Sequence, residues 1–159
     1  MAWWAVAEKI TAAKLNTTFP LTNGPTWSSY TAALTASSSN PTLGSGSNTA
    51  GRYTRIGDLV VIQVEILFGS SGAAAGSGTY SVSVPTGLDI ASSVETDIIA
   101  GTAELLNSGT RRHMCLARRS AATTVSLMAE STGGTVTHAS PFAWTNNDAI
   151  QLLLTYEMV

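Results

Sequence analysis

Beyond residue 25, apolar and polar residues alternate along much of the chain with the two-residue period of half-buried β-strands. The clearest run covers residues 58–68, in which every even-numbered position from 60 onward is apolar and Gln63 and Glu65 occupy the opposite face. Residues 150–158 repeat this arrangement, with apolar side chains at the even-numbered positions and Gln151 among the odd-numbered ones. Both segments are therefore expected to be strands that turn one face toward a core.

Six shorter segments carry the same signature and are separated by turns rich in Gly, Asn and Pro. They span residues 27–34, 51–55, 79–84, 97–106, 111–117 and 123–129. We therefore expect residues 25–159 to form an all-β domain, an antiparallel β-sandwich or jelly-roll-like fold of about eight strands. The Ser- and Gly-rich segments 37–48 and 69–78 are expected to be loops, the second of them mobile.

The first 24 residues follow a different pattern. A short helix is expected over residues 9–16, because the segment Ala12–Leu15 favours a helix and Asn16 can end it. The turn residues Asn23–Pro25 then separate this segment from the β-domain, and both lysines of the chain precede that break. Residues 1–24 are therefore expected to form an N-terminal arm.

This arm is expected to be an anchor. Trp3 and Trp4 are costly to leave in water, since a packed aromatic side chain buries about 150–250 Å². The residues expected to dock on a partner or on the domain itself are Trp3, Trp4, Val6, Ile10 and Leu15.

Composition narrows the class of protein. Of 159 residues, 44% are hydrophobic and 11% are charged, and the formal net charge is −2. This composition argues against intrinsic disorder and against a general nucleic-acid surface. Charged residues usually make up about 25% of a soluble domain, so a surface this poor in charge suits a subunit that packs against copies of itself.

The expected compartment is a reducing cytosol. The single cysteine, Cys115, excludes an intrachain disulfide, and the N-terminal residues do not form a secretion signal. No segment approaches the roughly 18 consecutive apolar residues of a membrane-spanning helix, so no membrane insertion is expected.

Residues that could carry catalysis are sparse. The two histidines, His113 and His138, lie in different segments, and no spacing of His, Cys or carboxylate residues indicates a metal site. Neither a Gly-x-Ser-x-Gly elbow nor a Gly-rich nucleotide-binding motif occurs. Glu65, Glu130 and Glu157 fall on outward strand positions, and nothing in the pattern pairs them as a glycosidase requires. We therefore expect no enzymatic activity and no cofactor.

Surface contacts are expected around residues 111–119, where two arginine pairs flank the apolar segment Met114–Leu116. Adjacent strand residues point to opposite faces, so each pair sends one arginine to each side. These arginines suit either a subunit contact through Arg–carboxylate pairing or an edge strand protected against aggregation. The segment 141–144 precedes a polar turn and is a candidate rim contact. The candidate subunit-contact residues are Arg112, Arg118, Phe142 and Trp144.

Aromatic residues also raise the idea of stacking on a sugar, although aromatic side chains on strands more often belong to the core. The residues concerned are Trp27, Tyr30, Phe142 and Trp144. Core packing is the favoured interpretation.

Several segments resemble virion proteins of tailed bacteriophages. Ile10–Asn16 is similar to an N-terminal motif of tail-fibre and other virion surface proteins. Four further segments resemble, in order, a β-module of actinobacteriophage proteins, and with the first they extend over roughly half of the chain. These are Trp27–Thr31, Asn40–Gly44, Gly51–Val60 and Gly78–Pro85.

The resemblance implies a β-sandwich head, commonly trimeric, that is mounted on a virion by an N-terminal segment. It implies a role in structure and adhesion, and it brings no catalytic residues. Relatives that carry the module at the C-terminus usually have a long fibre shaft, which this sequence lacks. A compact piece attached directly to the virion is therefore expected.

Three functions remain as hypotheses. The favoured one is a trimeric capsid (head) decoration protein on the virion surface, made in the host bacterial cytoplasm and docked on the major capsid protein by its arm. The alternative is a minor tail or tail-fibre receptor-binding knob, with other tail proteins as neighbours and a host surface glycan as a candidate partner. The third is a small hydrolase of surface polysaccharides or esters that uses His113 or His138.

Overall fold

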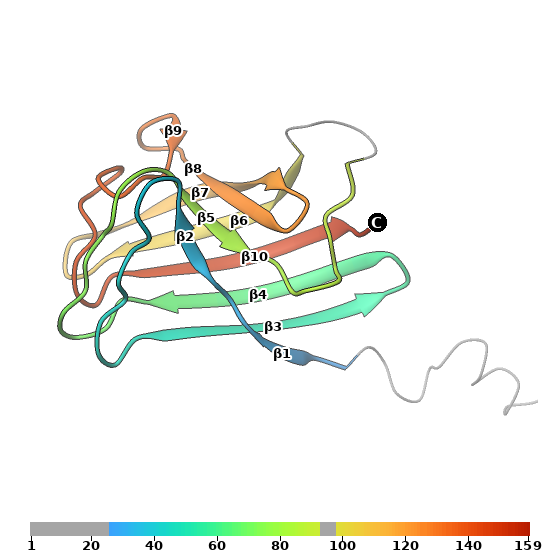
Figure 1. Cartoon of the computed structure of the whole chain (residues 1–159). Helices are drawn as coiled ribbons and strands as arrows, with labels where there is room; N and C mark the ends of the chain where they lie inside the picture. Colours follow the sequence, from blue (N-terminus) through green and yellow to red (C-terminus); the bar gives the residue numbers. More distant parts are fainter. Residues whose placement is uncertain (1–25, 93–97) are drawn as a thin grey trace, which may run out of the picture.

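The computed structural model describes residues 26–92 and 98–159, which are drawn in colour in Figure 1. These residues make up the expected β-domain. The expected anchor arm over residues 1–24 lies outside the described residues, together with its helix and its docking residues Trp3, Trp4, Val6, Ile10 and Leu15.

Ten β-strands form the described part of the chain, and all their pairings are antiparallel. In chain order they are β1 (Ser28–Thr31), β2 (Leu34–Ala36), β3 (Asn48–Ile56), β4 (Leu59–Leu67), β5 (Tyr80–Ser83), β6 (Ile99–Asn107), β7 (Arg111–Ala121), β8 (Thr124–Ala129), β9 (Gly134–Thr135) and β10 (Ala149–Glu157). Each expected segment corresponds to one strand except residues 27–34, which contribute to two. The two-residue β9 carries no apolar alternation and was not expected.

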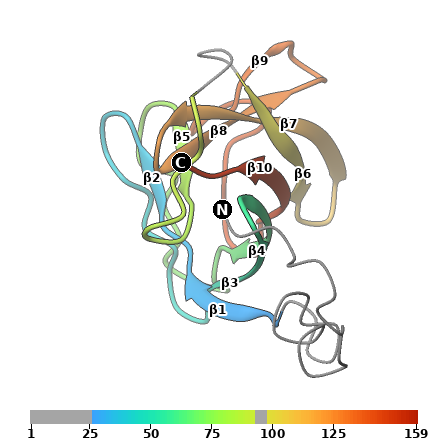
Figure 2. The same cartoon turned by 90° about the vertical axis from the view of Figure 1, so that its right-hand side faces the viewer.

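The strands belong to one curled sheet with the order β1-β3-β4-β10-β6-β7-β8-β5-β2, and β9 pairs with β8 (Figure 1). The two ends of this order, β1 and β2, are consecutive in the chain. Only Ala32 and Ala33 separate these two edge strands, so the sheet curls to bring its edges together at this point (Figure 2). The all-β antiparallel expectation is confirmed, whereas a sandwich or jelly-roll is not, because the strand pairings define a single continuous sheet.

A bend at Ala32 and Ala33 explains why one expected strand became two. The Ala32 amide donates to the Thr49 carbonyl oxygen at 3.1 Å, on the β3 side. The Ser83 amide donates to the Ala33 carbonyl oxygen at 3.0 Å, on the β5 side. The segment therefore changes its pairing partner within two residues, which the alternation of its side chains does not reveal.

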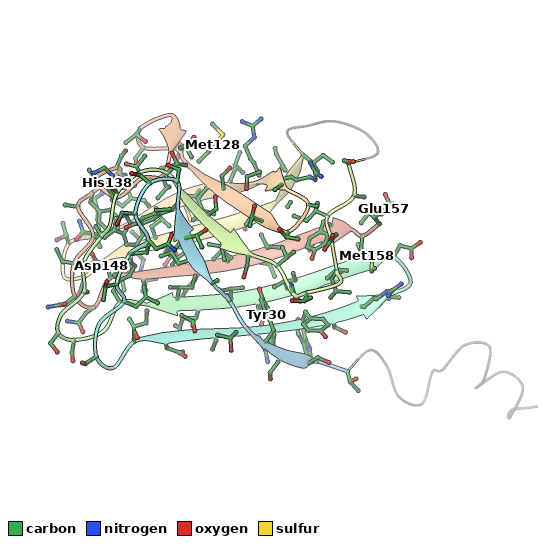
Figure 3. The ribbon with its side chains drawn as sticks, viewed as in Figure 1. Tyr30, Met128, His138, Asp148, Glu157 and Met158 are labelled. Carbon is green, nitrogen blue, oxygen red and sulfur yellow. The ribbon has the colours of Figure 1, made fainter. Side chains whose placement is uncertain are left out.

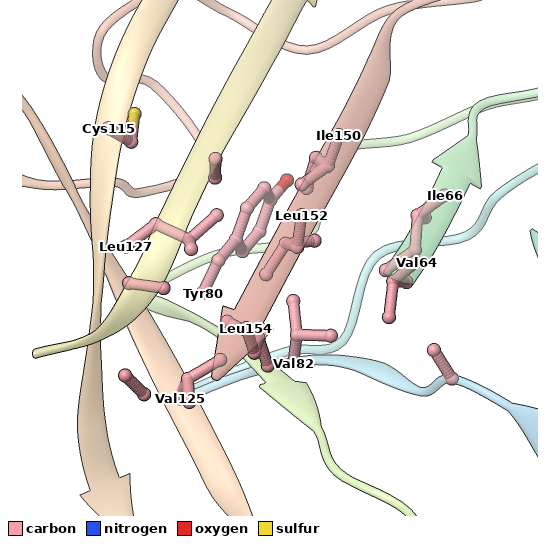
Figure 4. Close-up of a cluster of buried hydrophobic side chains, with 14 of the residues drawn as sticks. Val64, Ile66, Tyr80, Val82, Cys115, Val125, Leu127, Ile150, Leu152 and Leu154 are labelled. Atoms are coloured by element: carbon pink, nitrogen blue, oxygen red, sulfur yellow. The ribbon is translucent and has the colours of Figure 1, made fainter. Parts of the chain in front are cut away.

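The inner face of the sheet holds the core, part of which is shown in Figure 4. All even-numbered side chains of residues 60–68 and 150–156 are at most 5% exposed, as the alternation predicts. A fully buried aliphatic or aromatic side chain contributes about 1.5–3 kcal/mol through the hydrophobic effect. Thr123, the first residue of the expected strand 123–129, is exposed because it lies in the turn before β8.

An aromatic cluster closes one end of the core. The Trp144 ring stacks on Phe68, with centroids 5.3 Å apart, and packs against Tyr80 at 5.5 Å. Its indole Nε1 donates to the Thr137 carbonyl oxygen at 3.0 Å, which satisfies the polar group of the buried ring. Trp144 is only 3% exposed, so the structure places it in the core and not on the rim where a subunit contact was expected.

The Ser- and Gly-rich segments 37–48 and 69–78 lie against each other. Thr42 and Ala74 exchange two backbone hydrogen bonds of 2.9 and 2.8 Å. A Cβ atom at Gly69 would collide with a carbonyl oxygen of the facing segment, so only glycine permits this approach. The second segment is thus no mobile tip, because its small residues allow close packing of two backbones.

Asp148 secures the start of β10, at the opposite end of that strand from Glu157 (Figure 3). Its fully buried carboxylate accepts hydrogen bonds from the backbone amides of Ser108 at 2.8 Å and Thr145 at 2.6 Å. Hydrogen bonds to an ionised group are roughly twice as strong as neutral ones. Asp148 therefore ties the turn between β6 and β7 to the loop that enters β10.

Two neighbouring residues of β10, Leu153 and Leu154, provide a direct test of which face of this strand is buried in the core. Leu154→Ala is expected to lower the free energy of unfolding by about 2–5 kcal/mol, because it leaves a cavity in the core. Leu153→Ala is the matched control, since Leu153 is 48% exposed and its truncation should cost less than about 1 kcal/mol. Urea denaturation monitored by circular dichroism measures both. Equal losses for the two variants would contradict the assigned faces of β10.

Candidate binding groove on the outer face

The outer face of the sheet has a hollow of about 610 Å³ over β3, β4, β10, β6 and β7. Figure 2 shows these strands close to end-on. The volume lies within the range of about 300–1,000 Å³ that is typical of ligand sites. We call this hollow the outer-face groove. Its lining includes Ser29, Arg52, Gln63, Glu65, Thr102, Glu104, Met114, Gln151 and Leu153.

The strand register brings distant parts of the sequence together in the groove. One row across the sheet contains, in order, Arg52, Gln63, Leu153 and Thr102. The neighbouring row contains Glu65, Gln151 and Glu104. All these side chains lie on the face opposite to the core, because each strand buries its alternate residues.

The polar side chains of the groove form a hydrogen-bonded ladder. Arg52 donates from Nε and Nη2 to Gln63 Oε1, at 2.8 and 2.5 Å. Gln151 Nε2 donates to Glu65 Oε1 at 3.2 Å, and Asn48 Nδ2 donates to Glu65 Oε2 at 3.4 Å. These contacts connect β3, β4 and β10, and they restrain the groups that a ligand would meet.

Trp27 lies beside the groove, next to Arg52. The Arg52 guanidinium carbon is 4.8 Å from the centroid of the Trp27 ring, a cation–π arrangement. Trp27 is 44% exposed, so much of this large ring meets solvent. Trp27 is therefore accessible for stacking on a sugar. By contrast, Trp144 lies in the core, and Tyr30 is half-buried and packs against the core.

Apolar side chains occupy the other part of the groove. Leu153 is 48% exposed, Met114 is 55% exposed, and Leu116, two residues beyond Met114 on β7, is 44% exposed. The groove therefore combines a polar half over β3 and β4 with a more apolar half over β10 and β7.

The two candidate contact arginines lie on β7. Arg112 borders the groove, where its guanidinium forms an ion pair with the Glu104 carboxylate. Arg118 lies further along the strand, and its Nη1 donates to Met128 Sδ at 2.8 Å. A subunit contact through either arginine stays a prediction.

The two candidate contact aromatics lie away from the groove. Phe142 is half-buried between His113 and Trp144, with ring centroids 5.3 and 4.6 Å away. Phe142 is the more exposed of the pair, and a contact through it also stays a prediction.

The histidines have structural contacts. His138 Nδ1 accepts a hydrogen bond from the Gly78 amide at 3.1 Å. His113 is buried, and its Nδ1 lies 3.0 Å from Ser131 Oγ. Its Nε2 has no hydrogen-bond partner among the described residues. A serine–histidine contact is thus present, but no carboxylate of the described residues orients the His113 ring as a catalytic triad requires.

Other reactive chemistry is limited within the described residues. Residues 26–92 and 98–159 contain no group of three or more His, Cys, Asp or Glu side chains placed to hold a metal ion. Burial raises the pKa of the Cys115 thiol to about 11, which keeps it protonated at neutral pH. No helix that is long and apolar enough to cross a membrane occurs within this same part of the chain.

The groove residues were only partly visible in the sequence. Alternation placed Gln63, Glu65 and Gln151 on outward faces, and this is confirmed. It gave no sign that β4 and β10 are neighbours, so the contact between Glu65 and Gln151 was missed. Arg52 and Glu104 were also missed, since each lies in a strand with weak alternation.

The described residues thus form an all-β domain with a groove on the outer face of its sheet. No family model matches the sequence, and no curated protein matches it either. The structure is similar to part of the crystal structure of the Dettilon tailspike protein, with a TM-score of 0.55 and 21% sequence identity. The match covers 85% of this chain and 24% of the tailspike chain, so the chain spans about a quarter of that protein.

The buried histidine makes stability depend on pH. Burial and the nearby Arg111 charge lower the pKa of His113, so the folded protein binds this proton less readily than the unfolded chain. The contribution of His113 to the free energy of unfolding is therefore fully present above the ordinary histidine pKa of about 6.5. It is lost as the pH falls below that value, because the unfolded chain then binds the proton more readily. His113→Gln is expected to flatten this acid-side loss, measured as thermal midpoints between about pH 7 and 5. An unchanged pH slope in the variant would exclude His113 as the cause.

Proposed function

We propose that this chain is a non-enzymatic module of a bacteriophage virion that acts at the tail in attachment to the host. The observation that carries the proposal is the likeness of fold, over 85% of the chain, to part of a tailspike protein. The phage-like segments of the sequence support the same class independently. The outer-face groove supplies a surface with which such a module contacts the host.

The tail is favoured over the head. The sequence analysis favoured a capsid decoration protein, but no comparison supports decoration. The likeness to a tailspike instead favours the alternative hypothesis, a minor tail or receptor-binding knob. Synthesis in the host cytoplasm and neighbouring tail proteins as partners belong to this proposal.

A homotrimer is also part of the proposal. The charge-poor composition supports self-association, as do exposed apolar residues outside the groove. Ile99 is 57% exposed and pairs across the sheet with Arg118, which contacts Met128. This corner of β6, β7 and β8 is the part of the surface that best suits a subunit contact, since Met and Arg are enriched at interfaces.

Location on the virion tests the tail assignment. Antibodies raised against the purified chain and detected by immunogold electron microscopy are expected to label the tail at a few copies per particle. The same antibodies should reduce adsorption of the phage to its host. Dense labelling over the head would instead establish a decoration protein.

Turnover assays test the non-enzymatic part of the proposal. The purified chain is expected to release no product from a panel of polysaccharides and esters during prolonged incubation. The geometry behind this expectation is that no carboxylate within residues 26–92 and 98–159 hydrogen-bonds to His113 to orient its ring. Sustained turnover that disappears in His113→Gln, or in Ser131→Ala, would overturn it and support the hydrolase hypothesis.

A further inference from the structure

We propose that the outer-face groove binds a neutral oligosaccharide, laid across the strands from Trp27 toward Met114. This inference rests on the proposed attachment function and names the chemistry of the ligand. Neighbouring strands lie about 4.8 Å apart, so the five strands of the floor span about 19 Å. That length accommodates several sugar rings.

The hydrogen-bonding groups of the floor match hydroxyl groups. Gln63 Oε1 is occupied by Arg52, which leaves the two amide hydrogens of Gln63 as donors. Gln151 uses Nε2 as a donor to Glu65, which leaves Oε1 of Gln151 as an acceptor. A sugar hydroxyl both donates and accepts, so it suits a floor that offers each kind of group within neighbouring rows.

The ladder also orders these groups before a ligand arrives. Each amide is restrained by a charged neighbour, Gln63 by Arg52 and Gln151 by Glu65. Side chains that are already ordered lose less conformational entropy on binding, which favours affinity for a small polar ligand.

The apolar surfaces of the groove match the apolar faces of a sugar ring. A sugar ring presents C–H groups on its faces, which pack against aromatic and aliphatic side chains. Trp27 offers an exposed ring that Arg52 holds in place, and Leu153 and Met114 offer aliphatic surface further along the groove. Ligand sites typically combine such apolar walls with a few placed polar groups.

The charges in and beside the groove favour a neutral ligand. Arg52 and Arg112 are balanced by Glu65 and Glu104, and Arg112 pairs directly with Glu104. No net positive field attracts a nucleic acid or an acidic polymer. A second copy of the chain is disfavoured as the occupant, because glutamate is depleted at protein interfaces and this floor contains both Glu65 and Glu104.

Calorimetric titration of the full chain tests the site. The probes are linear oligosaccharides of four to six glucose, galactose, mannose, rhamnose or N-acetylglucosamine units, with oligogalacturonate as the acidic counterpart. At least one neutral probe is expected to bind, and the acidic probe is not. Trp27→Ala and Arg52→Ala should each weaken that binding by about tenfold or more, the loss expected when a placed polar or aromatic partner is removed.

Matched variants separate the site from the fold. Arg55 lies on β3 like Arg52, but it pairs with Asp58 outside the groove. Arg55→Ala should therefore leave the affinity for the oligosaccharide unchanged. Gln151→Glu changes the groove without changing its shape and should weaken binding, because the amide donor to Glu65 is lost and a like charge is added. Thermal midpoints of all variants verify that each is folded.

Three results would overturn the inference. One is the absence of binding by every neutral probe at about 1 mM, the weakest affinity the groove should support. Another is binding that Trp27→Ala and Arg52→Ala leave intact. The third is that a second copy of the chain occupies the groove. Sedimentation would then show an oligomer of the chain, and the Leu153→Asp variant would sediment as a monomer. None of these changes the immunogold result, so failure of the saccharide site is distinguishable from failure of the tail assignment.

Discussion

The closure of the sheet depends on one short length of backbone, residues 28–36, which contains both end strands of the sheet, β1 paired with β3 and β2 paired with β5. Ser83 is central to this closure, because its amide donates to the Ala33 carbonyl oxygen and its Oγ accepts from the Ala33 amide at 2.9 Å. Ala32, only 1% exposed, places a small side chain at the point where the backbone turns inward. The curl encloses the even-numbered faces of β4 and β10 and so creates the core.

The outer-face groove is a consequence of the same curl. Once one face of β3, β4, β10, β6 and β7 is committed to the core, the opposite face is left to solvent. Its polar residues hydrogen-bond to one another across three strands, which lowers the cost of ordering them. The outer face thus carries polar and charged side chains, whereas the inner face is committed to packing.

Two buried titratable side chains, His113 and Asp148, lie apart from the groove. His113 is buried beside Phe142, and its Nε2 has no hydrogen-bond partner in the described part of the chain. Asp148 is buried, and its carboxylate oxygens accept hydrogen bonds from two backbone amides. Both residues tie loops to the end of the sheet where the aromatic cluster of Trp144 lies. These two buried side chains thus have contacts that stabilise the fold, and the outer-face groove is built from arginine, amide, carboxylate, leucine and methionine side chains with Trp27 beside it.

The sequence by itself determined the strands and their faces. The period of two is a local property of an extended backbone, so the burial of Val60, Ile66 and Leu154 followed from it directly. Several features were decided only by the tertiary structure: the division of residues 27–34, the core position of Trp144, the packing of the two Ser- and Gly-rich segments, and the meeting of Glu65 with Gln151. Each depends on which strands become neighbours, and hydrogen bonds between residues far apart in the chain leave no periodic trace in either partner.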